Sequence, residues 1–316
     1  MAELKNKFTW SFSSSNDFEQ CRRRHYWKKY GSWDGWNKSS DPDKQKAYLL
    51  SKMQNRWSLI GVVAEQSIMW MLKQYQSKNF VNHNDVWNKI SRPLLTQKWN
   101  ESKERRWNEN PKRFCLLSEH YYEKDIDEIA IKKQIANQVK NCILNFEKSI
   151  LPRFSSIEDI QEIKILTPET PGDIEHFIFE GVKIYSIPDY AYRINDDIHI
   201  HDWKAGKVKT KEHRAQLSLY ALWAIEKYNY NLENIFLYIE YLNEPKVDPF
   251  QISKNELNFV KAKIEESVAE MTEYLVDFDR EKNVPLPKDE WEITADRSNC
   301  RFCNFKELCV DEFENM

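Results

Sequence analysis

The stretch Pro188–Lys204 reads PDYAYRINDDIHIHDWK, and it decides the fold that we expect for this chain. Two short runs rich in β-branched and aromatic residues, Tyr190–Ile194 and Ile198–Asp202, flank a polar group. Asn195 and Asp196 within that group are suited to a two-residue turn between antiparallel strands. The stretch therefore predicts a β-hairpin.

This hairpin gathers three charged side chains on one face. With a turn at residues 195–196, Asp189 lies directly opposite Asp202, and opposed side chains stand about 5 Å apart at Cβ. Lys204 follows Asp202 by two positions, so strand alternation places it on the same face. A turn moved by one residue sets Asp189 opposite Lys204 and keeps the group together, whereas a three-residue loop separates it. Two carboxylates and an ammonium group are thus expected to converge.

Two acids and a lysine in this arrangement suit the hydrolysis of phosphodiester bonds. That reaction uses a divalent cation, which polarises the phosphate and lowers the pKa of the attacking water. Asp189 and Asp202 offer the hard oxygen ligands that Mg²⁺ prefers, and Lys204 is suited to orient the water or to stabilise charge on the phosphate. The alternative for these residues by themselves is a surface ion pair, because D-x-K occurs by chance in most long proteins.

Composition narrows the class of protein. The chain has 316 residues, 41% of them hydrophobic and 31% charged, with an excess of aromatic residues. Only six glycines and no GxxxxGK[ST] motif argue against an ATP-driven motor. No apolar run approaches the ~20 residues of a membrane helix, and residues 1–8 lack a signal-peptide core. We therefore expect a cytoplasmic protein without a membrane partner.

The formal net charge of −3 restricts how the chain can bind a polyanion such as nucleic acid. Proteins that bind nucleic acid over a whole surface are usually basic, so such a contact must be concentrated in patches here. Two basic runs are candidates: Arg22, Arg23, Arg24, His25, Lys28 and Lys29, and further along Lys204, Lys207, Lys209, Lys211 and Arg214. The alternative for either run is an ordinary solvated face.

Hydrophobic spacing predicts a helical first half and an α/β second half. Apolar residues recur at helical intervals in 13–30, 54–76, 85–103 and 119–149, and Pro152 is expected to end this section. Strands are predicted at 160–166, 177–179, 182–192, 198–204 and 235–242, and helices at 211–228 and 257–278. We interpret residues 1–316 as a single domain with a helical section at 44–152 and an α/β core at 155–245.

Four cysteines near the ends of the chain predict a metal site. Cys300, Cys303 and Cys309 form a C-x2-C-x5-C cluster, and Cys21 lies near the start. Three thiolates are one ligand short of a tetrahedral site, and a fourth from the far end completes it. Thiols stay reduced in the cytosol, which favours metal ligation over disulfides.

Such a site joins residues 285–316 to residues 10–30 as a metal-cluster clasp. The two remaining cysteines, Cys115 and Cys142, lie far from this pattern in the sequence. We expect them to be buried or idle thiols.

Motifs along the chain resemble those of a nuclease superfamily. Pro188-Asp189 followed by Asp202–Lys204 resembles the P-D…(D/E)-x-K motif of the restriction-endonuclease-like, or PD-(D/E)xK, superfamily. Gln216 and Tyr220, four residues apart on the next predicted helix, resemble the Q-x3-Y motif of its RecB-like branch. These motifs occur in the family's order.

The cysteines resemble the iron–sulfur subset of that branch, which includes AddB-like helicase–nuclease subunits and CRISPR-adaptation nucleases. The start of the chain, from Phe12 to Cys21 and on to Tyr26, resembles the subset's S-x-S…C-P-x-x-F opening, with Arg22 in place of the usual proline. The resemblance covers residues 10–30, 54–70, 160–245 and 285–316, and it leaves 77–152 unexplained.

The resemblance implies a restriction-endonuclease-like mixed sheet flanked by helices, with a helical N-terminal section and a C-terminal iron–sulfur tail. It also implies that Cys21, Cys300, Cys303 and Cys309 hold a [4Fe–4S] cluster. Zinc is the alternative, because four thiolates at these spacings satisfy it equally well.

One position departs from the family pattern. The family's G-x-x-x-H element, whose histidine binds metal, reads Gly61–Glu65 here. A carboxylate in this mostly apolar stripe is costly unless it meets a cation or a hydrogen-bond donor. We expect Glu65 to replace the histidine as a metal ligand; the alternative is a side chain that reaches solvent. Glu162, on the first predicted strand of the core, is an additional candidate ligand.

These observations predict a Mg²⁺- or Mn²⁺-dependent deoxyribonuclease that acts on single strands or DNA ends. The acids Glu65, Asp189 and Asp202 are expected to bind the metal, Lys204 to serve the water and the phosphate, and the Q-x3-Y pair to support the site or touch DNA. Because motor motifs are missing, the expected partners are DNA and a separate helicase or defence-system protein, in DNA repair or antiviral defence. The alternatives are a non-catalytic DNA-end-binding subunit of a helicase–nuclease or defence complex, and a zinc-stabilised interaction module.

Overall fold

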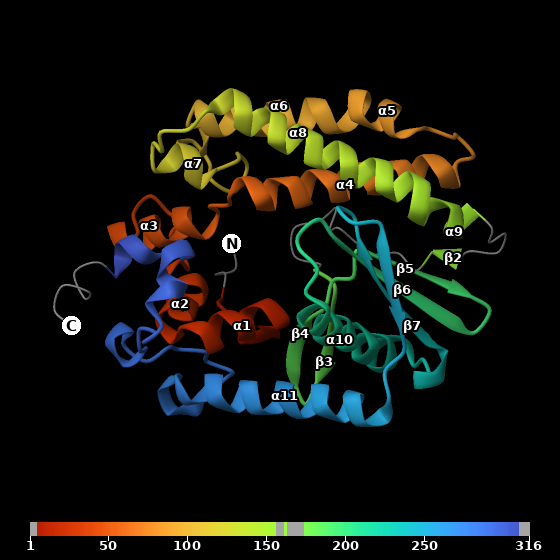
Figure 1. Ribbon diagram of the computed structural model, residues 1–316. Helices are drawn as coiled ribbons and strands as arrows, with labels where there is room; N and C mark the ends of the chain where they lie inside the picture. The colour runs from red at the N-terminus through yellow and green to blue at the C-terminus, as the bar shows by residue number, and fades with distance from the viewer. Residues whose placement is uncertain (1–4, 156–160, 163–173, 310–316) are drawn as a thin grey trace. The chain divides into compact units, whose positions relative to one another are not determined.

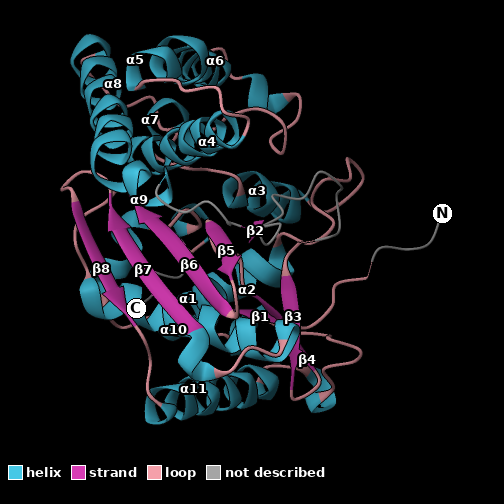
Figure 2. Ribbon diagram, turned by 90° about the vertical axis from the view of Figure 1, so that its right-hand side faces the viewer, coloured by secondary structure: helices cyan, strands magenta, loops and turns pink. Residues whose placement is uncertain are grey.

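The computed structural model describes residues 5–155, 161–162 and 174–309. These residues form helices and two mixed β-sheets (Figures 1 and 2), so the predicted α/β class is confirmed. The segment that we interpret as a single domain contains two compact units, and the chain passes between them more than once. The first unit comprises Met1–Met53, Thr170–Ser186 and Lys254–Met316, and the second comprises Gln54–Glu169 and Ile187–Ser253.

The second unit begins with a layer of helices. Helix α4 spans Arg56–Gln76, close to the predicted range, and begins where the side chain of Asn55 accepts hydrogen bonds from two backbone amides. Helix α8 (Glu128–Asn145) lies alongside α4 in Figure 1 and begins after the capping residue Asp127. The other helical elements are α5 (His83–Val86), η2 (Trp87–Ser91), α6 (Arg92–Lys103), η3 (Arg106–Asn108), α7 (Ser118–Tyr121), η4 (Phe146–Ile150) and α9 (Leu151–Ser155).

The expectation that Pro152 ends the helical section is wrong. Pro152 lies within α9, directly after the π-helical turn η4. Pro93 in α6 likewise follows the π-helical turn η2. A proline cannot donate a hydrogen bond to the preceding turn, and a widened π-helical turn lets the helix continue past it. The predicted helix at 119–149 is also interrupted, because residues 122–127 separate α7 from α8.

A five-stranded sheet completes the second unit, in the order β2-β5-β6-β7-β8. Its strands are β2 (Gln161–Glu162), β5 (Tyr190–Ile194), β6 (Asp197–Lys204), β7 (Ile235–Tyr241) and β8 (Lys246–Phe250). Helix α10 (Thr210–Tyr228) connects β6 to β7, and these two strands run parallel (Figure 2). β5 pairs with β6 and β8 pairs with β7, both in antiparallel fashion. We did not predict β8.

The predicted two-residue turn of the central hairpin is confirmed. Ile194 pairs with Asp197, which leaves Asn195 and Asp196 as the turn between β5 and β6. Asn195 adopts a left-handed conformation with φ of 52°, which asparagine tolerates better than most residues. The register of the whole hairpin follows from this turn.

The predicted strand at 182–192 is wrong, because it is two strands in different sheets. β4 (Val182–Tyr185) pairs with β3 (His176–Phe179) and with β1 (Thr9–Ser11) in the first unit, whereas β5 belongs to the second unit. Pro188 lies between them, and a proline has no amide hydrogen to give to a strand ladder. Of the predicted strand at 160–166, residues 161–162 form β2 and the others lie outside the described residues.

The first unit combines that three-stranded sheet with helices from both ends of the chain. The predicted helix at 13–30 is broken at Cys21, whose extended backbone (φ −166°) separates α1 (Phe12–Gln20) from α2 (Arg22–Tyr26). The further helical elements are η1 (Trp27–Gly31), α3 (Pro42–Ser51), which we did not predict, α11 (Lys254–Glu273), η6 (Val276–Phe278), η7 (Lys288–Glu290), η8 (Arg297–Phe302) and η9 (Lys306–Leu308).

Each unit has a buried interior that positions its site residues. In the second unit, apolar side chains of α4 and α8 such as Ile68 and Val139 form one cluster with Tyr190 and Trp203 of the sheet. In the first unit, Trp10 is buried and its indole nitrogen donates to Ser267 of α11. Among the described residues, no helix has the length and apolar character to cross a membrane.

Candidate active site and cysteine cluster

The hairpin register places two aspartates opposite each other. Tyr190 pairs with His201, so Asp189 and Asp202 are the next opposed residues at the open end of the hairpin. The carboxylate of Asp189 accepts a hydrogen bond of 2.7 Å from the backbone nitrogen of Trp203. This bond holds Asp189 beside β6, although it lies outside the regular part of β5.

Lys204 lies on the same face as Asp202 and contacts it directly. Its ammonium group forms an ion pair with Asp202 Oδ2 and donates to Gln216 Oε1 at 2.9 Å. Asp202 is 2% exposed, and apart from this ion pair its Oδ2 has no hydrogen-bond partner among the described residues. The lysine therefore supplies the positive charge that a buried carboxylate requires.

Gln216 and Tyr220 of α10 extend this contact into a network. Gln216 Nε2 donates to the Tyr220 hydroxyl at 3.0 Å, and that hydroxyl lies 3.2 Å from Asp202 Oδ1 and 3.1 Å from the carbonyl oxygen of Ile187. Burial raises the pKa of Tyr220 well above its usual value, and the nearby charge of Asp202 adds to the effect. Tyr220 therefore stays protonated and acts as a donor.

Glu65 of α4 approaches the same group of charges. Burial raises the pKa of its carboxyl group; the charge of Asp202 raises it further, and the charge of Lys204 acts in the opposite direction. These effects require Glu65 to lie near both side chains, although more than a hundred residues separate them in the sequence. The structure thus puts Glu65 close to Asp202 and Lys204, and its role as a metal ligand stays a prediction.

Asp189 is the carboxyl group with the strongest perturbation at this site. Burial raises its pKa well above the usual value, and the neighbouring charges of Asp202 and Glu65 raise it further. The hydrogen bond from Trp203 and the charge of Lys204 oppose this increase. Three acids thus share one lysine, so the site holds more negative than positive charge when all are ionised.

This donor set fits a hard divalent cation. Three carboxylates supply the oxygen ligands that Mg²⁺ or Mn²⁺ prefers, and an added cation relieves the repulsion that raises the pKa values of Asp189 and Glu65. Across the described residues, no three His, Cys, Asp or Glu side chains are arranged to hold a metal ion as they stand. The three acids therefore do not form a metal site as they stand, and sharing one ion would require their side chains to turn. The side chain of Glu162, the additional candidate ligand, lies outside the described residues.

A second polar network lies on the opposite face of β6. Glu240 of β7, which is fully buried, accepts hydrogen bonds from His201 Nδ1 at 2.9 Å and from Trp203 Nε1 at 2.6 Å. His201 and Trp203 flank Asp202 in the sequence, so Glu240 holds β6 on both sides of the catalytic candidate. We did not predict a role for Glu240 from the sequence. The feature that could have indicated one is a single acidic residue in an otherwise apolar predicted strand.

His213 of α10 was also missed by sequence reasoning. The charges of Lys204 and Asp202 both influence its pKa, which burial lowers, so it lies close to the site. Its Nδ1 lies 3.1 Å from the hydroxyl group of Tyr241. The available signal was helical spacing, because His213 precedes Gln216 by three residues and therefore shares its face of the helix.

The cysteines of the two chain ends lie in the same compact unit. The charges of Cys21 and Cys300 both act on the pKa of Cys303, which burial raises, and the amide nitrogen of Cys303 donates to the carbonyl oxygen of Cys300 at 3.2 Å. Cys309 is buried and lies in the same tail. These cysteines are free thiols in the structure.

Backbone and side-chain contacts tie the segment around Cys21 to the tail. Arg23 N donates to the carbonyl oxygen of Glu292 at 3.0 Å, and Arg23 Nε donates to that of Trp291 at 2.8 Å. The ring of Trp291 stacks on His25 with a centroid distance of 6.0 Å. Thiolates are the ligands that iron–sulfur clusters and zinc prefer, but among the described residues no three cysteines are placed to hold a metal ion as they stand.

Cys115 and Cys142 are buried, as expected. Burial raises the pKa of Cys115 to about 11 and that of Cys142 to about 12. Both thiols therefore stay protonated at neutral pH, and they are unsuited to bind metal.

The first basic run makes contacts within its own unit. Arg22 forms an ion pair with Glu270, and Arg24 and Lys28 both pair with Asp17. Arg23 is 3% exposed. These contacts favour a structural role for the run over a broad nucleic-acid surface.

Comparison with known proteins assigns the chain to a family. The family model described as "Protein of unknown function (DUF2800)" matches residues 96–316. This range is more than half of the 316 residues, so the chain belongs to that family. No curated protein matches the sequence. The matched range includes the hairpin and the terminal cysteines, and it begins after Cys21 and Glu65.

Proposed function

We propose that this member of the DUF2800 family is a Mg²⁺- or Mn²⁺-dependent DNA nuclease with a restriction-endonuclease-like core of the RecB-like type. The observation that carries the proposal is the gathering of Glu65, Asp189 and Asp202 around the ammonium group of Lys204. Perturbed carboxyl groups that share one cation are typical of functional sites. DNA, as single strands or ends, is the proposed substrate.

In this proposal the three acids hold the divalent cation. When bound, the cation polarises the phosphate and lowers the pKa of the attacking water. Because the pKa values of Asp189 and Glu65 are raised, protons compete with the cation for these side chains. Activity is therefore expected to fall as the pH decreases through the raised pKa values of these two groups.

In this proposal Lys204 provides the positive charge that contacts the phosphate group of the DNA substrate. Its ammonium group is held between Asp202 and Gln216, so it is oriented before substrate arrives. A fixed donor of this kind stabilises charge that develops on the phosphate oxygens. Tyr220 holds Asp202 from the other side through its hydroxyl group.

A [4Fe–4S] cluster on Cys21, Cys300, Cys303 and Cys309 is proposed as a structural part of the first unit. The charges of Cys21 and Cys300 both act on the pKa of Cys303, and this proximity supports the proposal. The cluster joins the two ends of the chain, and we assign it no redox step. Zinc in the same place is the competing assignment.

Lys204→Ala tests the nuclease proposal. We expect cleavage of end-labelled single- and double-stranded DNA with Mn²⁺ or Mg²⁺ to fall by about 100- to 1,000-fold, which is the effect of removing one such donor. Binding of the same DNA is expected to change little. The matched control is Lys73→Ala, which removes an exposed lysine of α4 in the same unit.

Equal cleavage by the Lys204→Ala variant and the parent protein would refute the role of Lys204. The second candidate function is a non-catalytic DNA-end-binding subunit. It is favoured by the finding that no three acidic side chains among the described residues are arranged to hold a metal ion as they stand. DNA binding by a parent protein that cleaves nothing with either metal would select this candidate.

A further inference from the structure

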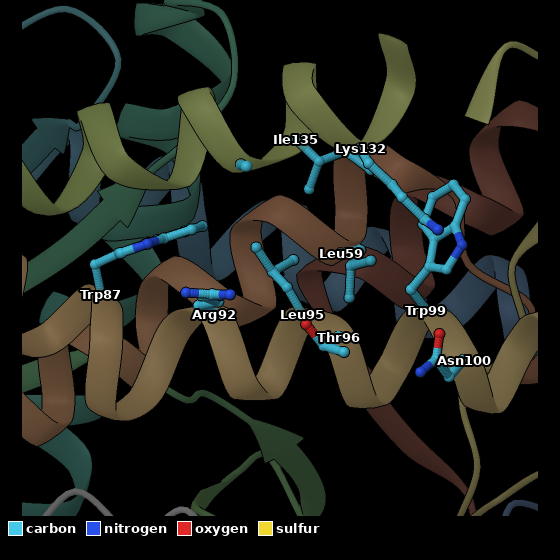
Figure 3. Close-up of a pocket in the computed structure, with 10 residues that line it drawn as sticks. Leu59, Trp87, Arg92, Leu95, Thr96, Trp99, Asn100, Lys132 and Ile135 are labelled. Carbon is cyan, nitrogen blue, oxygen red and sulfur yellow. The ribbon is translucent and has the colours of Figure 1, made fainter. Parts of the chain in front are cut away.

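The helical layer of the second unit contains a cavity that the proposed active site does not use. It has a volume of about 210 Å³ and is walled by α4, α8 and the continuous run of η2 and α6. Apolar side chains of Leu59, Leu95 and Ile135 form its floor. Figure 3 shows Trp87 and Trp99 at the two ends of the row of lining residues, with Leu59 and Leu95 between them.

Cations accompany both tryptophans. Lys132 Nζ lies 5.2 Å from the ring centroid of Trp99, and Lys140 Nζ lies 4.5 Å from that of Trp87. Arg92 is exposed and also lines the cavity. The carboxylate nearest to Lys132 is Glu128, at 3.5 Å, and this acid also receives a hydrogen bond of 2.9 Å from Lys103. Positive charge therefore dominates the rim.

The shape and charge of the cavity define the ligand. An apolar cavity of 150 Å³ is large enough for benzene, so about 210 Å³ accommodates a larger planar ring. Aromatic walls favour a flat ligand that stacks, and the cationic rim favours a ligand that also carries an anion. A nucleotide combines both properties, because its base is planar and its phosphate is negative.

We propose that this cavity binds an unpaired nucleotide of single-stranded DNA, with the base against Trp87 and the phosphate against the neighbouring Arg92. The inference rests on the proposed function and deepens it by naming a substrate subsite in the same compact unit. It also gives a role to residues 77–152, which the sequence resemblance leaves unexplained. A hydrophobic peptide matches the floor of the cavity but not its rim.

Binding measurements on the full chain test this subsite. We suggest fluorescence anisotropy with a labelled oligothymidylate, without divalent cations and in the Lys204→Ala background, so that cleavage does not interfere. Trp87→Leu is expected to weaken binding by about 5- to 150-fold, because a stacked base contributes about 1–3 kcal/mol. Arg92→Gln is expected to weaken it and to reduce the dependence of log K on log salt by about 0.7.

Two controls keep the result interpretable. Trp57→Leu removes a half-exposed tryptophan of α4 that also stacks with an arginine, Arg56, at 4.9 Å but does not line the cavity; its binding should match that of the background. Thermal unfolding checks the fold of the Trp87 variant, and Arg92 is exposed, so its substitution leaves the interior intact.

The subsite is refuted if Trp87→Leu and Arg92→Gln both bind within about twofold of the background, or if Trp57→Leu weakens binding as much as they do. This outcome is separable from failure of the nuclease proposal. Cleavage that depends on Lys204 but not on Trp87 removes only the subsite. Binding that depends on Trp87 in a protein that cleaves nothing removes only the catalysis.

Discussion

At the scale of single residues, the buried acids of the candidate active site have opposing effects on stability and function. Asp189 and Glu65 both have raised pKa values because burial and neighbouring carboxylates disfavour their charged forms. Burying several acids close together without a bound cation lowers the stability of the folded protein, although the same arrangement suits cation binding. The raised pKa values therefore indicate both a candidate function and a cost of folding.

Asp189→Asn should separate these two effects. Between the ordinary pKa of an aspartate and the raised value of Asp189, the folded state holds more protons than the unfolded state, so stability falls as pH rises. Asparagine carries no charge and still accepts the hydrogen bond from Trp203. We expect a thermal midpoint a few degrees above that of the parent at about pH 8, a smaller difference at about pH 4, and loss of cleavage.

The matched control for this experiment is Asp196→Asn in the exposed turn. Its thermal midpoint should follow that of the parent at both pH values. A less stable Asp189→Asn protein at about pH 8 would show that the charge of Asp189 is well compensated, contrary to our interpretation.

At the scale of elements, β6 is held from both faces. Asp202 and Lys204 project toward α10, where Gln216 and Tyr220 bind them, and His201 and Trp203 project to the other face. The acceptor on that other face is Glu240 of β7, the strand that lies beside β6 in Figure 2. The position of the candidate site on β6 thus depends in part on Glu240, which lies on the opposite face of the sheet.

Glu240→Ala should destabilise the second unit by about 3 kcal/mol. The substitution leaves two buried donors without their acceptor, and each such loss costs about 1–3 kcal/mol. Hydrogen exchange in β6 and β7 measures the effect at the place where it arises. Glu244→Ala, which removes an exposed acid between β7 and β8, is the control and should stay within about 0.5 kcal/mol of the parent. A loss below about 1 kcal/mol for Glu240→Ala would mean that His201 and Trp203 find other partners.

At the scale of the whole molecule, the two compact units contain different candidate sites. The acids and Lys204 belong to the second unit, and all four terminal cysteines belong to the first. The first unit is formed by both ends of the chain and by one short internal segment, Thr170–Ser186. A metal centre on these cysteines therefore closes the first unit and need not touch the chemistry of the second.

Cys303→Ser tests this arrangement. Protein prepared without oxygen should show broad visible absorption and about four iron atoms per chain, and the variant should lose both. Amide exchange in α1 and α2 should increase, while that of β5 and β6 stays unchanged. Cys142→Ser is the control, because Cys142 is a buried thiol of the second unit and should leave the absorption intact.

A colourless parent protein that contains zinc would replace the iron–sulfur assignment with a zinc site. Unchanged metal content in the Cys303→Ser variant would remove both assignments.

Local features of the sequence predicted the central hairpin and its turn. Alternation along β5 and β6, with Asn195 and Asp196 between them, was enough to place Asp189 opposite Asp202. The helical spacing of apolar residues likewise predicted α4, α10 and most of α11. These properties depend on neighbours a few residues apart, and periodicity records them directly.

Tertiary structure alone decided which elements face one another. Periodicity shows which residues of β7 share a face with Glu240, but only the pairing of β6 with β7 brings Glu240 to His201. The division of 182–192 between two sheets and the aromatic cavity of the helical layer were likewise absent from the pattern. The physical reason is that burying an apolar face stabilises the protein whichever element covers that face. The sequence therefore shows which faces are buried more clearly than which elements cover them.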